Sequence, residues 1–166
     1  MNWPKLAVAT TLAAALIASP ATAHTDCGDP DQPPCTGPVP TVDQVVAIMA
    51  ELTDPNRPAA SKGDVVAPGF SSDEAGTIDD HLHRTDEDGL LPYNFVVTDI
   101  FSAPANFAGV TVTVTGNFNQ RSAPQHIVLA DQRGHWLITH DAAWTMLDNF
   151  WYNAGRRYHP PAMGGI

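Results

Sequence analysis

Basic residues are scarce in this chain, and their scarcity limits the partners that it can have. The 166 residues include 8 lysines and arginines against 18 aspartates and glutamates, which gives a formal net charge of −10 at pH 7. A surface of this sign repels nucleic acids and anionic lipids at long range. We therefore expect no nucleic-acid partner and attribute the acidity to solubility.

Long apolar runs are also absent, with one exception at the N-terminus. The stretch from Leu6 to Ala18 is uncharged and follows Lys5. It is too short for a membrane span, which needs about 20 residues, but has the length of the apolar part of a secretory signal peptide. Small residues at Ala21 and Ala23 predict cleavage before His24. An uncleaved N-terminal anchor is the alternative.

Export has two consequences for the mature chain. Removing residues 1–23 removes Lys5 and no acid, so the formal charge goes from −10 to −11. No second apolar run exists, so we expect no membrane span. The expected location is extracellular or associated with the cell wall, and we expect a monomer.

Cysteine is represented only by Cys27 and Cys35, which lie just after the predicted cleavage site. An even pair in an oxidising compartment usually closes into a disulfide. The spacing is too wide for a Cys-x-x-Cys pair, and further metal ligands are absent nearby. We expect a local disulfide in a leader, residues 24–39, that is rich in proline and glycine.

Two helices are expected in the first half of the folded part. Thr41 and Gln44 have the spacing of a capping box, and apolar residues recur at helical spacing as far as Leu52. A second helix is expected from Ser71 or Ser72 to about residue 88, with Gly89 at its end. Residues 57–69 between them read as a loop.

The second half has the period of strands. Tyr93, Phe95, Val97 and Phe101 alternate, which places Asp99 on the same face of the predicted strand.

Three further strands and a helix are expected after this strand. Valine and threonine alternate over 110–115, which is typical of an antiparallel strand buried on one side. Residues 126–131 and 135–140 form a predicted hairpin around the turn 131–134. A last helix is expected from Asp141.

The predicted fold class is α+β, with helices on one face of a curved antiparallel sheet of about four strands. The domain is expected over residues 40–154. The tail 155–166 lacks periodicity and is expected to be disordered.

Several segments, taken in order, carry a family resemblance. Leu52-Thr-Asp-Pro-Asn56, Ser61-Lys-Gly63, Gly89-Leu-Leu-Pro92, Val97-Thr-Asp-Ile100 and Gly134-His-Trp-Leu-Ile-Thr139 are the most specific. The chain resembles the mycobacterial low-molecular-weight secreted antigen family over roughly residues 40–150. The resemblance implies a cystatin-like or nuclear-transport-factor-two-like domain, exported to the envelope or medium of an actinobacterium. It implies no catalytic residues and no cofactor. The cysteine pair and the basic, aromatic tail depart from the family.

One dense polar cluster could bind a metal ion. Asp79 and His83 are four residues apart on the second helix, as are His83 and Glu87, so each pair shares a helix face. Such a pair is half of a zinc site, and a third ligand cannot be identified. We expect these side chains to form a solvent-exposed helix end that binds no metal ion.

Asp99 is the residue with the clearest catalytic alternative. If its strand face lines a cavity under the helices, its carboxylate could act as a general base. An isolated carboxylate needs a second group, and we expect no catalytic residue.

Aromatic and histidine side chains supply the last candidates. Trp136 and Trp144 are expected in the core, whereas Trp151 and Tyr152 could be partly exposed. His140 beside Asp141 suggests part of a triad, but no serine lies in a nucleophile-elbow context.

The expected function is that of a secreted, non-enzymatic antigen-type protein that meets a protein or an envelope partner. The alternatives are a small-molecule binder with an apolar cone-shaped pocket and, with less support, an enzyme that uses Asp99 as a base.

Overall fold

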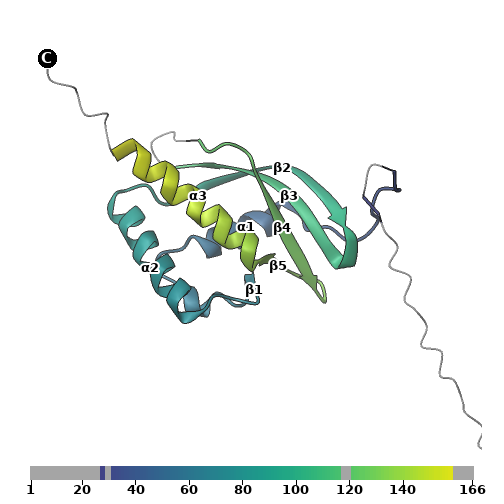
Figure 1. Cartoon of the computed structure of the whole chain (residues 1–166), viewed down its shortest axis with the longest axis horizontal. Coiled ribbons are helices and arrows are strands. Elements are labelled where there is room, and N and C mark those ends of the chain that lie inside the picture. Colours follow the sequence, from purple (N-terminus) through teal and green to yellow (C-terminus); the bar gives the residue numbers. More distant parts are fainter. Residues whose placement is uncertain (1–26, 29–30, 117–120, 159–166) are drawn as a thin grey trace, which may run out of the picture.

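The computed structural model of the chain describes residues 27–28, 31–116 and 121–158, with 152–158 as backbone only (Figure 1). The predicted signal peptide and its cleavage site between Ala23 and His24 lie outside these residues. The helices and strands follow in the order α1 (Val42–Leu52), β1 (Val66–Ala67), α2 (Ser72–Glu87), β2 (Asn94–Ala103), β3 (Phe107–Thr115), β4 (Gln125–Gln132), β5 (His135–Thr139) and α3 (His140–Tyr158).

The first two helices begin as the sequence predicts. The Thr41 hydroxyl accepts the N–H of Gln44, and the Thr41 N–H donates to the Gln44 side chain over 2.9 Å. Ser71 and Glu74 make the same capping box at the start of α2. Gly89 follows α2 with a φ of +70°, a left-handed conformation that favours glycine.

The sheet has five strands in the order β1-β5-β4-β3-β2 and is antiparallel except for β1, which pairs parallel with β5. The sequence predicted about four strands, because residues 66–67 fell in a predicted loop. A two-residue strand is too short to show an alternating pattern. The predicted hairpin is confirmed, and its turn has positive φ at Arg133 and Gly134.

A β-bulge interrupts β2. Val97 pairs with Val112, whereas the next pair joins Asp99 to Thr111, so Thr98 is an extra residue. An extra residue turns the following side chains to the opposite face of the sheet.

The bulge corrects the predicted face of Asp99. Phe95 and Val97 pack against the core, whereas Asp99 and Phe101 point to the other side and are exposed. The alternation in the sequence runs evenly through the bulge, so it gave no sign of the change of face. We call the side of the sheet that carries Asp99 the outer face.

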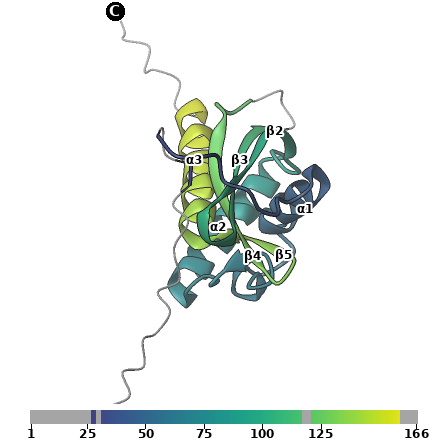
Figure 2. The same cartoon turned by 90° about the vertical axis from the view of Figure 1, so that its right-hand side faces the viewer.

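One hydrophobic core joins all three helices to the inner face of the sheet. Every strand residue in this core has the same facing, as the strand register shows. Helix α1 approaches both β2 and β5, which are separated by two strands, so the sheet must curve around α1 (Figure 2). The predicted α+β class, with helices over one face of a curved sheet, is confirmed.

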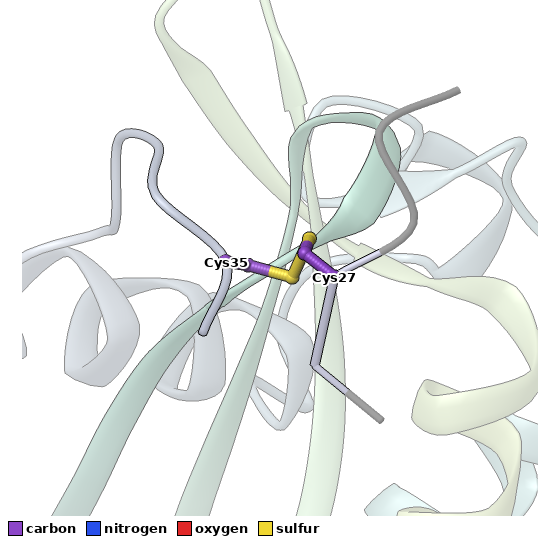
Figure 3. Close-up of a disulfide and its surroundings, with 2 residues drawn as sticks. All are labelled: Cys27 and Cys35. Carbon is purple, nitrogen blue, oxygen red and sulfur yellow. A yellow bond between two sulfur atoms is a disulfide. The ribbon is translucent and has the colours of Figure 1, made fainter. Parts of the chain in front are cut away.

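Two segments flank the core, namely the leader before α1 and the C-terminal part of α3. Cys27 and Cys35 form the predicted disulfide, which closes a short loop ahead of α1 (Figure 3). Helix α3 continues to Tyr158, past the predicted end of the domain at 154 and into the predicted tail. Residues 159–166 lie outside the described part. Within that part, no helix is long and apolar enough to cross a bilayer.

Candidate functional site

An open hollow of about 640 Å³ lies where the end of β1 meets the first turns of α2 and α3. The turn at residues 67–69 forms one wall. Thr139 and four linked polar side chains form the rest. We call these four the His140 cluster: Ser71, Glu74, His140 and Asp141.

Hydrogen bonds link the four side chains in a row. The Ser71 hydroxyl donates to Glu74 Oε2 over 2.7 Å. Glu74 Oε1 lies 3.0 Å from His140 Nε2, and His140 Nδ1 lies 3.2 Å from Asp141 Oδ1. The cluster therefore joins the beginning of α2 to the beginning of α3.

Local structure fixes both ends of this link. Glu74 is held by the capping box with Ser71, so its carboxylate can turn only a little. His140 opens α3 directly after β5, and its ring packs beside Phe70 with 5.7 Å between centroids. Sequence reasoning paired His140 with Asp141 but missed Glu74, which lies 66 residues away along the chain.

The cluster favours a protonated His140 between two carboxylates. The Ser71 hydroxyl, the Ser71 N–H and His140 together lower the pKa of Glu74 to about 2. Hydrogen bonds to Asp141 and Glu74 raise the pKa of His140 above its ordinary value of 6.5. Each partner thus stabilises the charged form of the other.

The hydrogen bonds of the cluster occupy both ring nitrogens of His140 and the Ser71 hydroxyl. Both ring nitrogens of a protonated His140 donate hydrogen bonds, so neither has a lone pair to offer a proton or a metal ion. The Ser71 hydroxyl bonds to Glu74 and not to His140, so His140 does not activate it as a nucleophile.

The polar side chains on α2 that were considered as half of a metal site have separate roles. The Asp79 carboxylate accepts the N–H of Ala59 over 2.8 Å. His83 Nδ1 bonds to the backbone oxygen of Asp79, and His81 stacks on Trp151 with 4.2 Å between ring centroids. Across the described residues, no three histidine, cysteine, aspartate or glutamate side chains converge on a point.

The aromatic side chains serve the core, as the sequence indicates. Trp136 is buried, and Trp144 and Trp151 are half-buried against the core. Their indole rings lie edge to face, 6.1 Å apart. The side chain of Tyr152 lies outside the described residues.

Lys62 is a buried ionisable residue that the sequence analysis did not single out. Its side chain is 0% exposed, and its ammonium donates to the backbone oxygens of Leu52 and Asp54 over 2.8 and 2.9 Å. These carbonyls lie at the end of α1, where backbone oxygens lack helical partners. Burial lowers the pKa of Lys62 to about 8. In the sequence, Lys62 belongs to the segment Ser61-Lys-Gly63 of the family resemblance, but that segment indicates no role for its side chain.

Comparison with known proteins shows where this chain belongs. Residues 38–153 match the family described as low molecular weight antigen MTB12, C-terminal domain. The MTB12 antigen of Mycobacterium bovis is 34% identical over 109 residues, which cover 66% of this chain and 64% of the relative. That of Mycobacterium tuberculosis is 33% identical with the same coverage. The Mycobacterium leprae homolog is 27% identical over 71% of this chain and 70% of its own length.

The chain spans slightly less than two thirds of the length of the first two relatives. Among solved structures, a Campylobacter jejuni protein described as NTF2-like aligns with a TM-score of 0.41 and 13% identity, over 58% of this chain and 94% of the other. The family match extends over more than half of the chain and includes α1, the whole sheet and most of α3. This chain therefore belongs to the family of the C-terminal domain of the low molecular weight antigen MTB12.

Proposed function

We propose that this protein is an exported, non-catalytic protein that acts by binding a protein or a component of the actinobacterial cell envelope. Its place would be the medium or the cell wall. The signal-peptide pattern of residues 1–23 supports export, and so does membership of a family whose relatives carry the name antigen.

The observation that supports a non-catalytic role most directly is the hydrogen bonding of the His140 ring. Its two ring nitrogens are hydrogen-bonded to Glu74 and Asp141, in the hollow described above. The other candidate, Asp99, is exposed on the outer face, away from the core that could have enclosed a substrate. A general base needs a free lone pair beside an enclosed substrate, and neither residue offers both.

A pull-down tests the proposal. The mature chain, immobilised, is incubated with culture filtrate and with solubilised envelope from the producing organism. We expect a component that is retained in proportion to the protein and is displaced by free mature chain. Chemical conversion of the retained component, lost in a His140→Gln or an Asp99→Asn variant, would contradict a non-catalytic role.

Small-molecule binding is the second candidate, and one hollow favours it. Between α1 and the start of β5, Ala47, Ile48, Val65 and Trp136 line a mainly apolar hollow of about 190 Å³. Ligand pockets usually measure about 300 Å³ or more, so only a small apolar group would fit. A rise in melting temperature with an apolar ligand panel would support this function, because a ligand that binds the native state stabilises it.

A further inference from the structure

The outer face of the sheet exposes large apolar side chains in an otherwise acidic molecule. Val96, Phe101 and Val128 are 47%, 54% and 42% exposed, and all three lie on this face. The strand residues that pack against the helices in the core all lie on the inner face, whereas these three side chains are open to solvent.

The strand register arranges this surface in rows that cross β2, β3 and β4. One row is apolar and consists of Phe101, Gly109 and Val128. The ring of Phe101 lies directly over Gly109, because a Cβ atom at position 109 would lie 2.1 Å from the ring. The row therefore has the Phe101 ring above Gly109 on β3 and an exposed valine on β4.

The neighbouring row is polar and consists of Asp99, Thr111 and His126. Thr111 Oγ1 lies 3.1 Å from His126 Nδ1. The Asp99 carboxylate and His126 Nε2 have no hydrogen-bond partner among the described residues, and both side chains are exposed. The row thus has an acceptor on β2 and an imidazole nitrogen on β4.

The two rows match the same rows of a second copy if the copies are related by a two-fold axis. This axis runs parallel to β3 and lies in front of the outer face. Rotation about this axis places β2 of one copy over β4 of the other. Asp99 then faces His126 of the second copy, and this contact is repeated by symmetry. The two Phe101 rings, each over its own Gly109, meet near the axis with Val128 beside them. An interface of this kind uses one patch on both subunits.

Charge also favours this face for contact between two copies. The chain carries a net charge of −10, which opposes self-association elsewhere. Among the outward-facing residues of β2, β3 and β4, Asp99 is the only acid, and the rotation sets it opposite an imidazole. Two acidic molecules meet the least repulsion where acids are few and paired.

We propose that the outer face is a docking surface for a second copy of this chain, which forms a two-fold symmetric dimer through β2, β3 and β4. This replaces the monomer expected from the sequence alone. It is independent of the proposed function, because a dimer can form whether or not a further partner binds.

Sedimentation equilibrium of the mature chain tests the dimer. At about 100 μM, a dimer with a micromolar dissociation constant is the main species, so we expect twice the mass of one chain. Val128→Glu places a carboxylate in the interface and should raise the dissociation constant at least about tenfold. Val42→Glu is the matched control, because Val42 is 49% exposed on α1, away from the outer face. It should leave the dimer intact.

A swap of the polar pair tests the geometry. Asp99→His and His126→Asp should each weaken the dimer, because like groups then face each other. The double variant restores opposite groups and should bind about as well as the natural chain. A natural chain with the mass of one copy at about 100 μM, or a Val128→Glu variant as dimeric as Val42→Glu, would overturn the proposal. If the double variant has a dimer dissociation constant no lower than that of either single variant, the proposed position of the two-fold axis is wrong. Melting curves confirm that each variant is folded.

Discussion

Among single residues, Lys62 should contribute most to stability through polar contacts. Its ammonium is the partner of two carbonyls at the end of α1, and its side chain is fully buried. Lys62→Met keeps the volume but leaves these buried oxygens without a donor, which should lower the free energy of unfolding by about 2–3 kcal/mol. Urea unfolding measures the loss. Ser61→Ala, at an exposed neighbour, is the control. A loss from Lys62→Met no larger than that from Ser61→Ala would show that the capping contributes little.

The same residue gives a pH dependence whose sign follows from its lowered pKa. An unfolded lysine holds its proton up to about pH 10.5, whereas folded Lys62 releases it near pH 8. Between these values the unfolded state binds more protons, so the contribution of Lys62 to stability rises with pH. The difference in unfolding free energy between the natural chain and Lys62→Met should therefore widen from pH 8 to 10.5. A constant difference would contradict the lowered pKa.

The His140 cluster should stabilise the fold mainly at mildly acidic pH. The raised pKa of His140 means that its contribution is fully present below its ordinary value of 6.5 and disappears as the pH rises through the raised value. The lowered pKa of Glu74 means that its contribution is present above 4.5 and disappears as the pH falls towards 2. We expect His140→Gln to lower the melting temperature by a few degrees near pH 5.5 and by less near pH 9. An equal loss at both values would contradict a protonated His140.

The two carboxylates beside His140 should not contribute equally. Asp141 is the larger cause of the raised pKa of His140, and Glu74 follows it. However, the Asp141 side chain is fully exposed, whereas that of Glu74 is 29% exposed and held by its capping box. Water screens an exposed charge, so we expect Glu74→Gln to reduce the melting temperature more than Asp141→Asn at pH 5.5. A larger fall in melting temperature for Asp141→Asn than for Glu74→Gln would show that Asp141 stabilises protonated His140 more than Glu74 does.

At the scale of elements, the contact between Phe101 and Gly109 joins β2 to β3 on the outer face. Gly109→Ala puts a methyl group where the ring lies. The ring is the free end of an exposed side chain and can turn away, so the loss should be about 1 kcal/mol. In a Phe101→Ala background the same change should cost little, since no ring is displaced. A double-mutant cycle measures this difference. Equal costs in both backgrounds would place the strain elsewhere.

The disulfide belongs to an element outside the core. Its loop lies wholly within the leader, and the core begins with α1. If the loop unfolded together with the core, breaking the bond would cost about 2–3 kcal/mol. We expect the joint change of Cys27 and Cys35 to serine to alter the free energy of unfolding by less than about 0.5 kcal/mol. Urea unfolding of the oxidised chain and of this variant makes the comparison.

Elements with strong local signals could be predicted from the sequence. The capping box at Thr41, a serine cap at residue 71 or 72, the hairpin turn at Gly134 and the α+β class all follow from local patterns. Strand β1 could not be predicted, because its two residues form a strand only through their pairing with β5. The face of Asp99 was wrong because a bulge depends on pairing between strands, which alternation within one strand does not report.

The candidate site was predicted only in part, for a similar reason. His140 and Asp141 are neighbours in the sequence, so their pairing could be proposed. Glu74 joins them only because the fold brings the first turns of α2 and α3 together, as Figure 1 shows for the two helices. The capping role of Lys62 likewise depends on where the chain returns after α1. Contacts between residues that are far apart in the sequence cannot be predicted until the arrangement of the elements is known.

At the scale of the whole molecule, the chain has an acidic α+β domain of the MTB12 family. Its buried and clustered polar groups hold the structure together, with Lys62 at the end of α1 and the His140 cluster between α2 and α3. Its outer face remains available for contact with other molecules. The proposed function requires that residues 1–23 direct export and are then removed.

Intact-mass spectrometry of the native protein, purified separately from culture filtrate, envelope and cytosol, tests that requirement most directly. We expect the filtrate or the envelope to contain a chain that begins at His24 and has two hydrogens fewer than the reduced form, because Cys27 and Cys35 are joined. A full-length chain that retains Met1 and accumulates in the cytosol would contradict the account.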